Sequence, residues 1–564
     1  MSRIHSLQIE NFRGIKNFNQ VFHMKPFICL IGRGDSGKTT ILKAISYVLC
    51  PNWNISISDL DFYEADITKK IIIEAVVGDL PNELTSIQKY GQYINLLDGD
   101  KVTSEIDDPN ADQEKIVLRI RLTIDSTLEP KWEVCSGRDI GDIAIPASDR
   151  AKLNMFMVSD YIDNHFAYSK GSPLYALLRQ ELKDKTVIDK KMIEVVRNSY
   201  EAIKEAKTFK EFDDVTLNVK KAAQNIGLTI TNLETMLEYK DNAYTESNIT
   251  LHSNDIPYRL QGKGSKRLLS MAIQKGLVFD GGIMLIDEIE QGLESDRARN
   301  LARLLSKNEK AQIFITTHSQ DVIKEPEISS VYLMRKGENK LCKYPEILQG
   351  TIRSQPAAFF AKRVISCEGA TEEGIIRAIN DHLQEERGYG LAVQGIVHID
   401  GSGSNQFYNY AQIFNSMGYD SLVFCDDDNR AVDKDKEEAI NNRIKVVLCD
   451  NGKAIEQQLF NDLPWEAICE LLDYAIQEHG EQKIIVSNGF GSVEEIKNAT
   501  EEMQIIWREK LGEKAKSKQA WFKNIHHGEQ LGRTLIKYLS QMDAECTLKK
   551  EYEEILKWIG NDIN

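Results

Sequence analysis

The sequence predicts a multidomain α/β protein, and three observations lead to this prediction. The chain has 564 residues, which is too long for a single hydrophobic core. A glycine-rich phosphate-binding loop lies at residues 32–39, but the acidic pair that such a loop requires, Asp287-Glu288, comes far later in the chain. From about residue 359, short apolar strands alternate with helical segments. We therefore expect a nucleotide-binding domain with a large insertion, followed by a second domain built on a parallel sheet.

The composition is that of an ordinary globular protein, with 42% hydrophobic and 28% charged residues. The formal net charge of −16 argues against a protein that is held on nucleic acid by bulk attraction, although it allows a local basic groove. No apolar run approaches the roughly 20 residues that cross a bilayer, and the first residues carry no export or lipidation signal. We expect a cytoplasmic protein without a membrane partner. The cysteines show no paired spacing, which favours buried reduced thiols over zinc ligands or disulfides.

The N-terminal segment predicts a strand, a loop and a helix in succession. Residues 4–14 alternate apolar and polar side chains, as an edge strand does, and residues 27–31 form an apolar strand that runs into the glycine loop. From Thr39 onward the apolar residues have helical spacing. Residues 71–77 and 116–124 are strand-like, and we expect them to form an antiparallel sheet beside the loop.

Each part of the phosphate-binding loop has a physical role. Its glycines let backbone N–H groups point at phosphate, Lys38 brings a positive charge to the β and γ oxygens, and the Thr39 hydroxyl can bind magnesium. A glycine-rich turn without a ligand is the weaker interpretation, because the loop follows a strand and opens a helix. The predicted nucleotide contacts in this loop are Gly32, Gly34, Asp35, Ser36, Gly37, Lys38, Thr39 and Thr40.

Three later motifs strengthen the nucleotide interpretation. Residues 283–288 read as a buried strand that ends in Asp287, a ligand of the magnesium shell, and Glu288, which would polarise the attacking water. Residues 313–319 form another strand ending in His318, a candidate sensor of the γ-phosphate. The segment at residues 261–267 contains Ser265 and precedes a helical stretch.

In order and spacing, these motifs resemble the signature loop, Walker B motif, D-loop and switch histidine of ABC-type ATPases. The resemblance implies a homodimer with ATP held between protomers, in which Ser265 contacts phosphate across the interface. Lys266 and Arg267 stand where transporters carry glycine and glutamine, and Ile289 replaces a common proline. These departures favour the DNA-associated branch of the superfamily over a transporter.

The segment from about 165 to 250 changes character and predicts a helical insertion. Apolar residues recur at helical spacing among many charges, at Leu174, Leu177, Leu178, Leu182, Val195, Val196, Tyr200 and Ile203. Two interpretations remain open, structural packing and a dimerisation element. We expect an ATPase domain in two parts, 1–164 and 251–355, separated by this insertion at 165–250 and followed by a second domain at 356–564.

The second domain carries acidic residues at the ends of its predicted strands. Glu368 follows the strand 363–367 and Glu372 falls in the next helical turn. Asp426 and Asp428 follow the strand 422–425 and share a face, because alternate residues do so. Four such carboxylates repel one another unless cations neutralise them, and Mg²⁺ or Mn²⁺ suits oxygen ligands. The alternative is that they are solvated acids that cap helices.

Further residues are candidates for the same centre. Glu456 would add an acid for a second metal, and Asp450 at the preceding strand end competes with it. Downstream, basic residues interleave with aromatic ones, which favours either a path for a phosphodiester or a solvated face. The residues concerned are Lys510, Lys514, Lys516, Lys518, Trp521, Phe522, Lys523, His526 and His527.

The glutamate followed by Asp-x-Asp resembles the Toprim domain of topoisomerases, primases and certain nucleases. An ABC-type ATPase followed by a Toprim domain resembles the overcoming-lysogenization-defect (OLD) family of endonucleases, whose members include the Gabija nuclease and retron-associated nucleases. The resemblance implies metal ligation by Glu368, Glu372, Asp426 and Asp428 and a catalytic role for Lys523. It also implies a DNA substrate, regulation by ATP, a homodimer or higher homo-oligomer, and service in antiphage defence. Members of the family work alone, with a partner protein or with a retron RNA–DNA element, and all three remain open here.

Two other functions compete with this interpretation. An ATP-driven clamp or sensor would use a Toprim domain that binds nucleic acid without cutting it. A primase or topoisomerase is the third interpretation, which the absence of a strand-passing tyrosine context disfavours.

Overall fold

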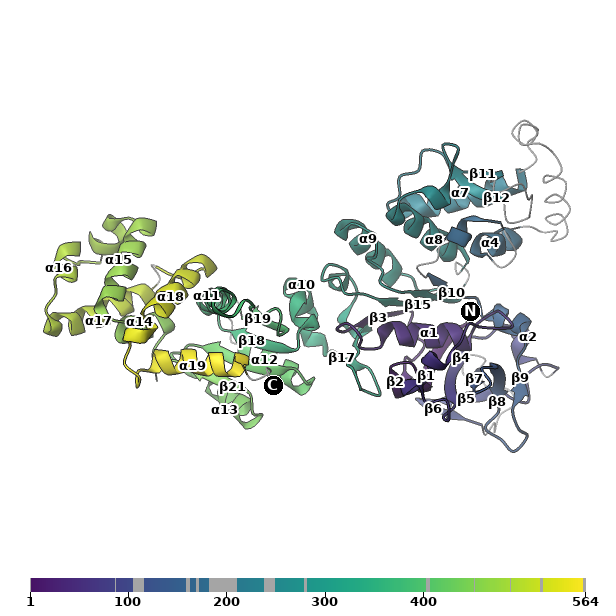
Figure 1. Cartoon of the computed structure of the whole chain (residues 1–564), viewed down its shortest axis with the longest axis horizontal. Helices are drawn as coiled ribbons and strands as arrows, with labels where there is room; N and C mark the ends of the chain where they lie inside the picture. The colour runs from purple at the N-terminus through teal and green to yellow at the C-terminus, as the bar shows by residue number, and fades with distance from the viewer. Residues whose placement is uncertain are drawn as a thin grey trace. The chain divides into compact units, whose positions relative to one another are not determined.

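The structure, a computed structural model, divides into two compact units, Met1–Pro356 and Ala357–Asn564 (Figure 1). It describes residues 2–86, 88–104, 116–158, 163–168, 172–181, 210–237, 249–277, 281–401, 406–450, 452–486, 488–517 and 521–560. All nine cysteines are free thiols. Each unit has its own hydrophobic core, so we describe each one by itself.

The first unit contains a six-stranded, mostly parallel sheet in the order β10-β14-β15-β3-β16-β17. The strands are β3 (Phe27–Ile31), β10 (Met155–Val158), β14 (Ile283–Ile286), β15 (Gln312–Thr316), β16 (Val331–Leu333) and β17 (Cys342–Lys343). Every residue of β3, β14 and β15 is buried, as expected for parallel strands covered on both faces. Because β3, β15 and β14 are neighbours and parallel, the loops that follow them meet at one edge of the sheet.

A second sheet is antiparallel and lies on the other side of helix α1 (Lys38–Val48), which contacts strands of both sheets. Its strand order is β2-β1-β4-β7-β5-β6, and β8 and β9 extend from β7. The strands are β1 (Arg3–Phe12), β2 (Ile15–Val21), β4 (Ile71–Gly78), β5 (Asn95–Asp98), β6 (Lys101–Thr103), β7 (Ile116–Ile124), β8 (Lys131–Cys135) and β9 (Ile143–Ala144). The antiparallel pairing of β4 with β7 confirms the expectation from the sequence.

The prediction that the first strand is an edge strand is wrong. β1 pairs with β2 on one side and with β4 on the other, and β2 forms the edge. The sequence does not predict β2, because Lys16, Asn17 and Asn19 have low strand propensity.

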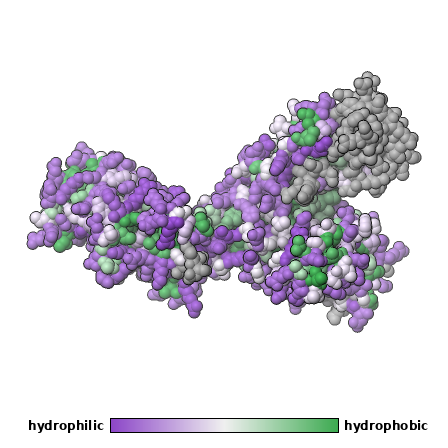
Figure 2. All heavy atoms as spheres, in the orientation of Figure 1, coloured by the Kyte–Doolittle hydropathy of each residue, from purple (hydrophilic) through white to green (hydrophobic). Residues whose placement is uncertain are grey.

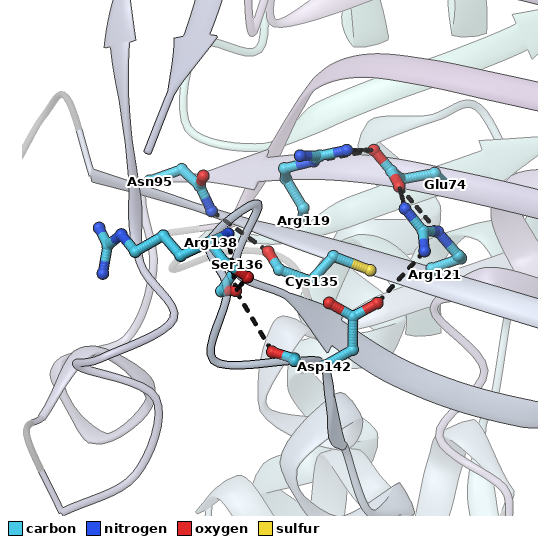
Figure 3. Close-up of polar contacts among 9 residues, drawn as sticks. Glu74, Asn95, Arg119, Arg121, Cys135, Ser136, Arg138 and Asp142 are labelled. Carbon is cyan, nitrogen blue, oxygen red and sulfur yellow. Dashed lines mark hydrogen bonds and ion pairs between the residues drawn. The ribbon is translucent and has the colours of Figure 1, made fainter. Parts of the chain in front are cut away.

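The outward face of the antiparallel sheet is held by ion pairs, which Figure 3 shows. Ile120 and Leu122 of β7 point into the core, whereas Arg119 and Arg121 point outward. Both arginines donate through Nε, at 3.0 Å each, to the carboxylate of Glu74, whose side chain is nearly buried (Figure 3). Arg121 also contacts Asp142 at 3.2 Å. These charges compensate one another, so the nearly buried Glu74 carboxylate is not left unpaired on the sheet.

The insertion is only partly helical. Helices α4 (Pro173–Glu181) and α7 (Lys210–Asn225) pack against α8 (Lys263–Leu277), where they bury Leu177, Val215 and Val219. Three short strands that the sequence did not reveal, β11 (Glu234–Leu237), β12 (Ile249–Ser253) and β13 (Ile256–Pro257), form an antiparallel sheet. Its members are too short and too polar for a period-two pattern. The candidate stripe residues Leu182, Val195, Val196, Tyr200 and Ile203 lie outside the described residues.

The second unit begins with a parallel four-stranded sheet in the order β19-β18-β20-β21, which confirms the predicted parallel α/β domain. The strands are β18 (Arg363–Cys367), β19 (Ile396–Asp400), β20 (Asp420–Cys425) and β21 (Lys445–Leu448). The helices of the sheet region are α11 (Ala370–Arg387), α12 (Phe407–Ser416), α13 (Asp433–Asn441) and α14 (Ile455–Asp462). A helical C-terminal part follows, with α15 (Trp465–His479), α16 (Val493–Lys497), α17 (Glu501–Lys516), α18 (Ile525–Tyr538) and α19 (Thr547–Gly560).

Glycines let α18 lie directly on α11. A Cβ atom on Gly374 would stand 2.3 Å from the Ile525 carbonyl oxygen, and one on Gly528 would stand 2.4 Å from the Thr371 carbonyl oxygen. Only glycine fits at such a contact between two backbones. The crossing brings the start of α18, and Lys523 just before it, to the first turn of α11.

Hydrophilic side chains cover most of the face drawn in Figure 2, and apolar ones form small separate patches. Among the described helices, none has both the length and the apolar character needed to span a membrane.

Candidate functional site

The phosphate-binding loop joins β3 to α1 in a conformation that suits an anion. Gly32, Asp35 and Gly37 have φ values of 148°, 57° and 104°, and positive φ values of this kind occur in the backbone turns that bind anions. Lys38 Nζ donates to the carbonyl oxygens of Gly32 and Arg33, at 2.9 Å each, so the loop wraps around the ammonium. Burial lowers the pKa of Lys38, while the nearby acids, Asp287 first, act to raise it.

The acidic partner of the loop is where the sequence predicts it. Thr39 Oγ1 donates to Asp287 Oδ1 at 3.1 Å, although the two residues are 248 positions apart. Thr316 Oγ1 donates to the same oxygen at 2.6 Å and accepts from the Glu288 backbone N–H at 2.7 Å. Thr39 and Asp287 thus present two oxygens to one point, as the ligand shell of a nucleotide-bound Mg²⁺ requires.

His318 and Glu288 line one cavity of about 680 Å³ together with the phosphate-binding loop. The His318 backbone N–H donates to Glu290 Oε1 at 2.6 Å, and Thr317 Oγ1 donates to Glu290 Oε2 at 2.7 Å. Glu290 therefore fixes the turn that carries His318. Sequence reasoning missed it, although its place two residues after Glu288 was a usable signal. Burial, and then Lys38, lower the pKa of His318.

The rest of the cavity wall was not predicted. It comes from the turn between β1 and β2, from Tyr63 and from the connection between β16 and β17. The lining residues outside the loop motifs are Gly14, Ile15, Lys16, Asn17, Tyr63, Met334, Lys336, Gly337, Glu338 and Asn339. Ser265 lies in the first turn of α8 and is not among the residues that line this cavity.

Arg267, which departs from the transporter pattern, is a buried link between α8 and the loop after β14. Its guanidinium donates to Gln291 Oε1 at 2.6 Å, to the Glu288 carbonyl at 2.8 Å and to the Asp287 carbonyl. The side chain is only 4% exposed. Three acceptors in a fan suit a planar guanidinium and would not suit a lysine.

In the second unit, three of the predicted acids converge. Glu368 follows β18, Asp426 and Asp428 follow the neighbouring strand β20, and one oxygen from each lies within 4.8 Å of the others. The Asp426 backbone N–H donates to Glu368 Oε2 at 3.1 Å, and the Ile455 N–H donates to Asp426 Oδ1 at 2.6 Å. Asp427 points elsewhere and pairs with Lys436 at 2.6 Å.

Two further predicted acids and a lysine adjoin this cluster from the buried side. Glu372 accepts the Gly369 N–H at 3.0 Å, and Glu456 on α14 is fully buried, with Lys523 Nζ at 3.3 Å from its Oε1. Burial, and then the neighbouring acids, raise the pKa of Glu372 to about 8 and that of Asp426 to about 9. Burial acts to lower the pKa of Lys523, but Glu456 and Asp426 raise it above its usual value.

The structure does not bring Asp450 to the cluster. Its carboxylate accepts from Thr547 and from Gln458 Nε2, the latter at 3.1 Å, and pairs with Lys453 at 3.3 Å. The hydrogen bond from Thr547, the largest effect, lowers the pKa of Asp450. Glu456, the alternative to Asp450, is the acid beside the cluster.

The residues of the predicted basic and aromatic path do not lie along one surface. Trp521 and Phe522 are completely buried in the core, so they are not faces on which a base can stack. Their burial anchors Lys523 instead. Lys516 pairs with Asp428 at 2.7 Å, Lys510 and Lys514 are exposed on α17, and Lys518 lies outside the described residues.

This donor set fits divalent cations with a preference for oxygen. Glu372 and Glu456 are buried, and Asp426 beside them is half-buried. Among the described residues, Glu456 forms an ion pair with Lys523, at 3.3 Å. One lysine does not offset the charge of these three acids. Hard cations such as Mg²⁺ or Mn²⁺ would, and carboxylates are their usual ligands.

Comparisons with solved structures find Smc head domains and the recombination mediator protein RecF. The Smc head domain of Pyrococcus furiosus, bound to the C-terminal domain of ScpA, is 15% identical with a TM-score of 0.38 and covers 63% of this chain and 100% of its own. The recombination mediator RecF with ATP is 13% identical with a TM-score of 0.37, at 61% and 98% coverage. The SMC head of Thermotoga maritima is 14% identical with a TM-score of 0.29, at 61% and 99% coverage. No curated protein matches the chain.

Three family models match parts of the sequence. An AAA ATPase domain matches residues 3–225, and an AAA domain described for an AbiEii toxin of a type IV TA system matches residues 183–324. The TOPRIM domain of overcoming-lysogenization-defect-like proteins matches residues 359–428, which hold Glu368, Asp426 and Asp428. The chain thus carries an ATPase domain followed by a Toprim domain. These matches support an ATPase–Toprim protein of the OLD type.

Proposed function

We propose that this protein is an ATP-regulated, divalent-metal-dependent DNA endonuclease or nickase that serves in antiphage defence. The observation that carries the proposal is the convergence of Glu368, Asp426 and Asp428 within 4.8 Å, backed by buried Glu372 and Glu456. A cluster of this charge has no structural use that a hydrophobic core would not serve better.

The residues of the second unit divide the work of phosphodiester hydrolysis. Glu368, Asp426 and Asp428 would hold the cations on the accessible side, with Glu372 and Glu456 on the buried side. Cations held there would supply a nucleophilic water at neutral pH and stabilise the leaving oxygen. Lys523 places a positive charge beside the cluster, where it offsets the negative charge that builds up on the phosphate in the transition state.

The first unit binds and hydrolyses ATP. With ATP bound, Lys38 would contact the β and γ oxygens, Thr39 and Asp287 would hold Mg²⁺, and Glu288 would orient the attacking water. His318 lies on the cavity wall, from which it would contact the γ-phosphate. Ser265 acts in a second copy of the chain, so that ATP is bound between two protomers and its turnover regulates cleavage.

Substitution of the carboxylates tests the nuclease activity. We expect Asp426→Asn and Glu368→Ala to abolish Mg²⁺- or Mn²⁺-dependent nicking of plasmid DNA while ATP binding stays intact. Asp427→Asn is the matched control, because its carboxylate pairs with Lys436 outside the cluster. Cleavage that survives in Asp426→Asn would refute the assignment. Metal and DNA binding without any cleavage by the native protein would support the clamp or sensor instead.

The defence role has a separate test in cells. Expression of the native chain in a phage-sensitive host, with its neighbouring genes, should lower plaque formation, and Asp426→Asn should restore it. Equal protection by both forms would show that cleavage is not the defensive activity.

A further inference from the structure

Among the described residues, two lysines form ion pairs with the acidic cluster, one at its buried end and one at its solvent-facing end. Lys523 contacts Glu456, whose side chain is fully buried, so it belongs to the inner end. Lys516 contacts Asp428 Oδ2 at 2.7 Å, and the two side chains are 34% and 22% exposed, so this pair belongs to the solvent-facing end. Asp428 is one of the three acids whose oxygens converge. Lys516 therefore sits on a predicted metal ligand, at the side from which a substrate arrives.

We propose that Lys516 is a substrate-phosphate residue that also competes with the metal: it holds Asp428 until a divalent cation binds there and then turns to the DNA backbone. The inference rests on the proposed function for its second half only. The competition between Lys516 and a cation concerns the protein and the metal alone.

The backbone of Lys516 is fixed relative to the cluster. α17 packs against α14, the helix that carries Glu456, and a Cβ atom on Gly512 would stand 3.2 Å from the Gln457 Cα. One turn earlier on the same face of α17, Arg508 Nη1 donates to the carbonyl oxygens of Phe460, Asn461 and Leu463 at 3.0, 3.0 and 2.7 Å. These contacts hold α17 against α14, so the exchange proposed here needs movement of the Lys516 side chain only.

The chemistry of the side chain allows the exchange. An ammonium is a point charge on a flexible four-carbon stem, so it can leave one oxygen for another while its Cα stays in place. Asp428 Oδ2 cannot hold an ammonium at 2.7 Å and a divalent cation at ligand distance without strong repulsion between the two cations. A divalent cation that gains several carboxylates displaces the ammonium. The released Lys516 then lies beside the bound cation and faces solvent, where a backbone phosphate binds.

Metal titration without nucleic acid or nucleotide tests the competition. We expect Lys516→Gln to bind Mn²⁺ about threefold to tenfold more tightly than the native chain, since it loses a partly exposed competing ion pair. Lys516→Arg keeps the positive charge and should bind Mn²⁺ no more tightly than the native chain. Lys514→Gln removes the same charge from an exposed position on the same turn and should change nothing. The titrations are followed by isothermal calorimetry. Asp426→Asn removes a predicted ligand of the cluster, so the heat that remains in this variant comes from Mn²⁺ bound at other sites.

Unchanged or weaker Mn²⁺ binding in Lys516→Gln would overturn the proposal, and unfolding curves of all variants exclude a folding defect as the cause. The second part of the proposal is that Lys516 binds a DNA backbone phosphate. For this part, we expect Lys516→Gln at saturating metal to raise the KM for DNA about tenfold while kcat stays nearly unchanged. The salt dependence of DNA binding should fall by about one phosphate contact. A loss confined to kcat would contradict the phosphate role. A native chain that cuts no DNA would defeat the proposed function and leave the metal result standing.

Discussion

At the scale of single residues, the partners of a carboxylate decide its chemistry more than its position does. Asp426 and Asp450 each stand just after a parallel strand of the same sheet. Burial, and then Glu372, raise the pKa of Asp426 to about 9, whereas a hydrogen bond from Thr547 lowers the pKa of Asp450. An acid whose charge is already satisfied has little to gain from a cation, so Asp450 is a structural acceptor and Asp426 is the better candidate for a metal ligand.

Glu551 on α19 supplies a prediction about stability. Its side chain is 5% exposed, and neither carboxylate oxygen has a hydrogen-bond partner among the described residues. Burial, and then Asp462 and Asp450, raise its pKa from 4.5 to about 9. Between those values the folded chain keeps a proton that the unfolded chain releases, so stability falls as pH rises, by up to about 1.4 kcal/mol per pH unit.

We expect Glu551→Gln to reduce this pH dependence, because glutamine has no proton to lose. Denaturant unfolding of the second unit at pH 5 and pH 8 would measure it. Glu553→Gln, on the exposed face of the same helix, should keep the native pH dependence. If Glu551→Gln loses as much stability from pH 5 to pH 8 as the native chain does, Glu551 is charged in the folded state.

Arg267 supplies a prediction about the ATPase. Its guanidinium holds two carbonyl oxygens of the Asp287-Glu288 turn and one side-chain oxygen. A lysine has the charge but not the geometry for these acceptors, so Arg267→Lys should destabilise the first unit by about 1 to 3 kcal/mol. ATP turnover should fall about tenfold or more, with ATP binding nearly kept, because Lys38 and the loop are untouched. Native turnover in Arg267→Lys would show that the turn needs no such support. Lys275→Ala, in the last turn of α8, is the control.

At the scale of elements, the apolar strands were the most predictable part. β3, β14, β15 and β18 are continuous buried runs that end in chemically distinctive residues, so both their type and the sites at their ends followed from the sequence. The polar strand β2 and the short strands β11 to β13 did not follow, because pairing with neighbours, rather than composition, makes them strands. Trp521 and Phe522 were predicted to lie along the path of the DNA, but both are buried in the core. A short loop has no hydrophobic periodicity that would indicate this burial.

The crossing of α11 and α18 supplies a prediction at this scale. A Cβ atom on Gly528 would stand 2.4 Å from the Thr371 carbonyl oxygen, and a backbone atom cannot move aside as a side chain can. Gly528→Ala should therefore push α18 away from α11 at a cost of about 1 to 3 kcal/mol. Because Lys523 lies just before α18, cleavage should fall strongly while ATP turnover by the first unit is unchanged.

The matched control is Gly560→Ala, since no atom lies within 4 Å of a Cβ placed there. Plasmid nicking and ATP turnover are measured on the same preparations. Native nicking in Gly528→Ala, with its altered melting temperature as proof that the contact changed, would show that Lys523 needs no precise placement.

At the scale of the whole molecule, the acidic residues and loops of each candidate site all come from one unit. Thr39 and Asp287 meet inside Met1–Pro356, and Glu368, Asp426 and Asp428 meet inside Ala357–Asn564. Motifs could locate both sites because the ends of neighbouring parallel strands gather at one sheet edge whatever their distance in the chain. The contacts of the supporting residues Glu290, Arg267 and Lys516 could not be predicted this way, because no motif encodes the turn, the carbonyl oxygens or the carboxylate that each one holds.

Separate cores predict separate unfolding transitions with separate ligands. A ligand that binds only the folded form raises the free energy of unfolding by about 2.7 kcal/mol when its concentration is 100 times its dissociation constant. For a unit of this size, the melting temperature then rises by a few degrees. We expect calorimetry to resolve two transitions, one raised by Mg²⁺ with a slowly hydrolysed ATP analogue and the other by Mn²⁺ without nucleotide. Lys38→Ala should remove the first shift and keep the second, and Asp426→Asn should do the reverse. A single transition that both ligands raise, and that both substitutions affect, would show that the two units unfold together and that their sites are coupled through the fold itself.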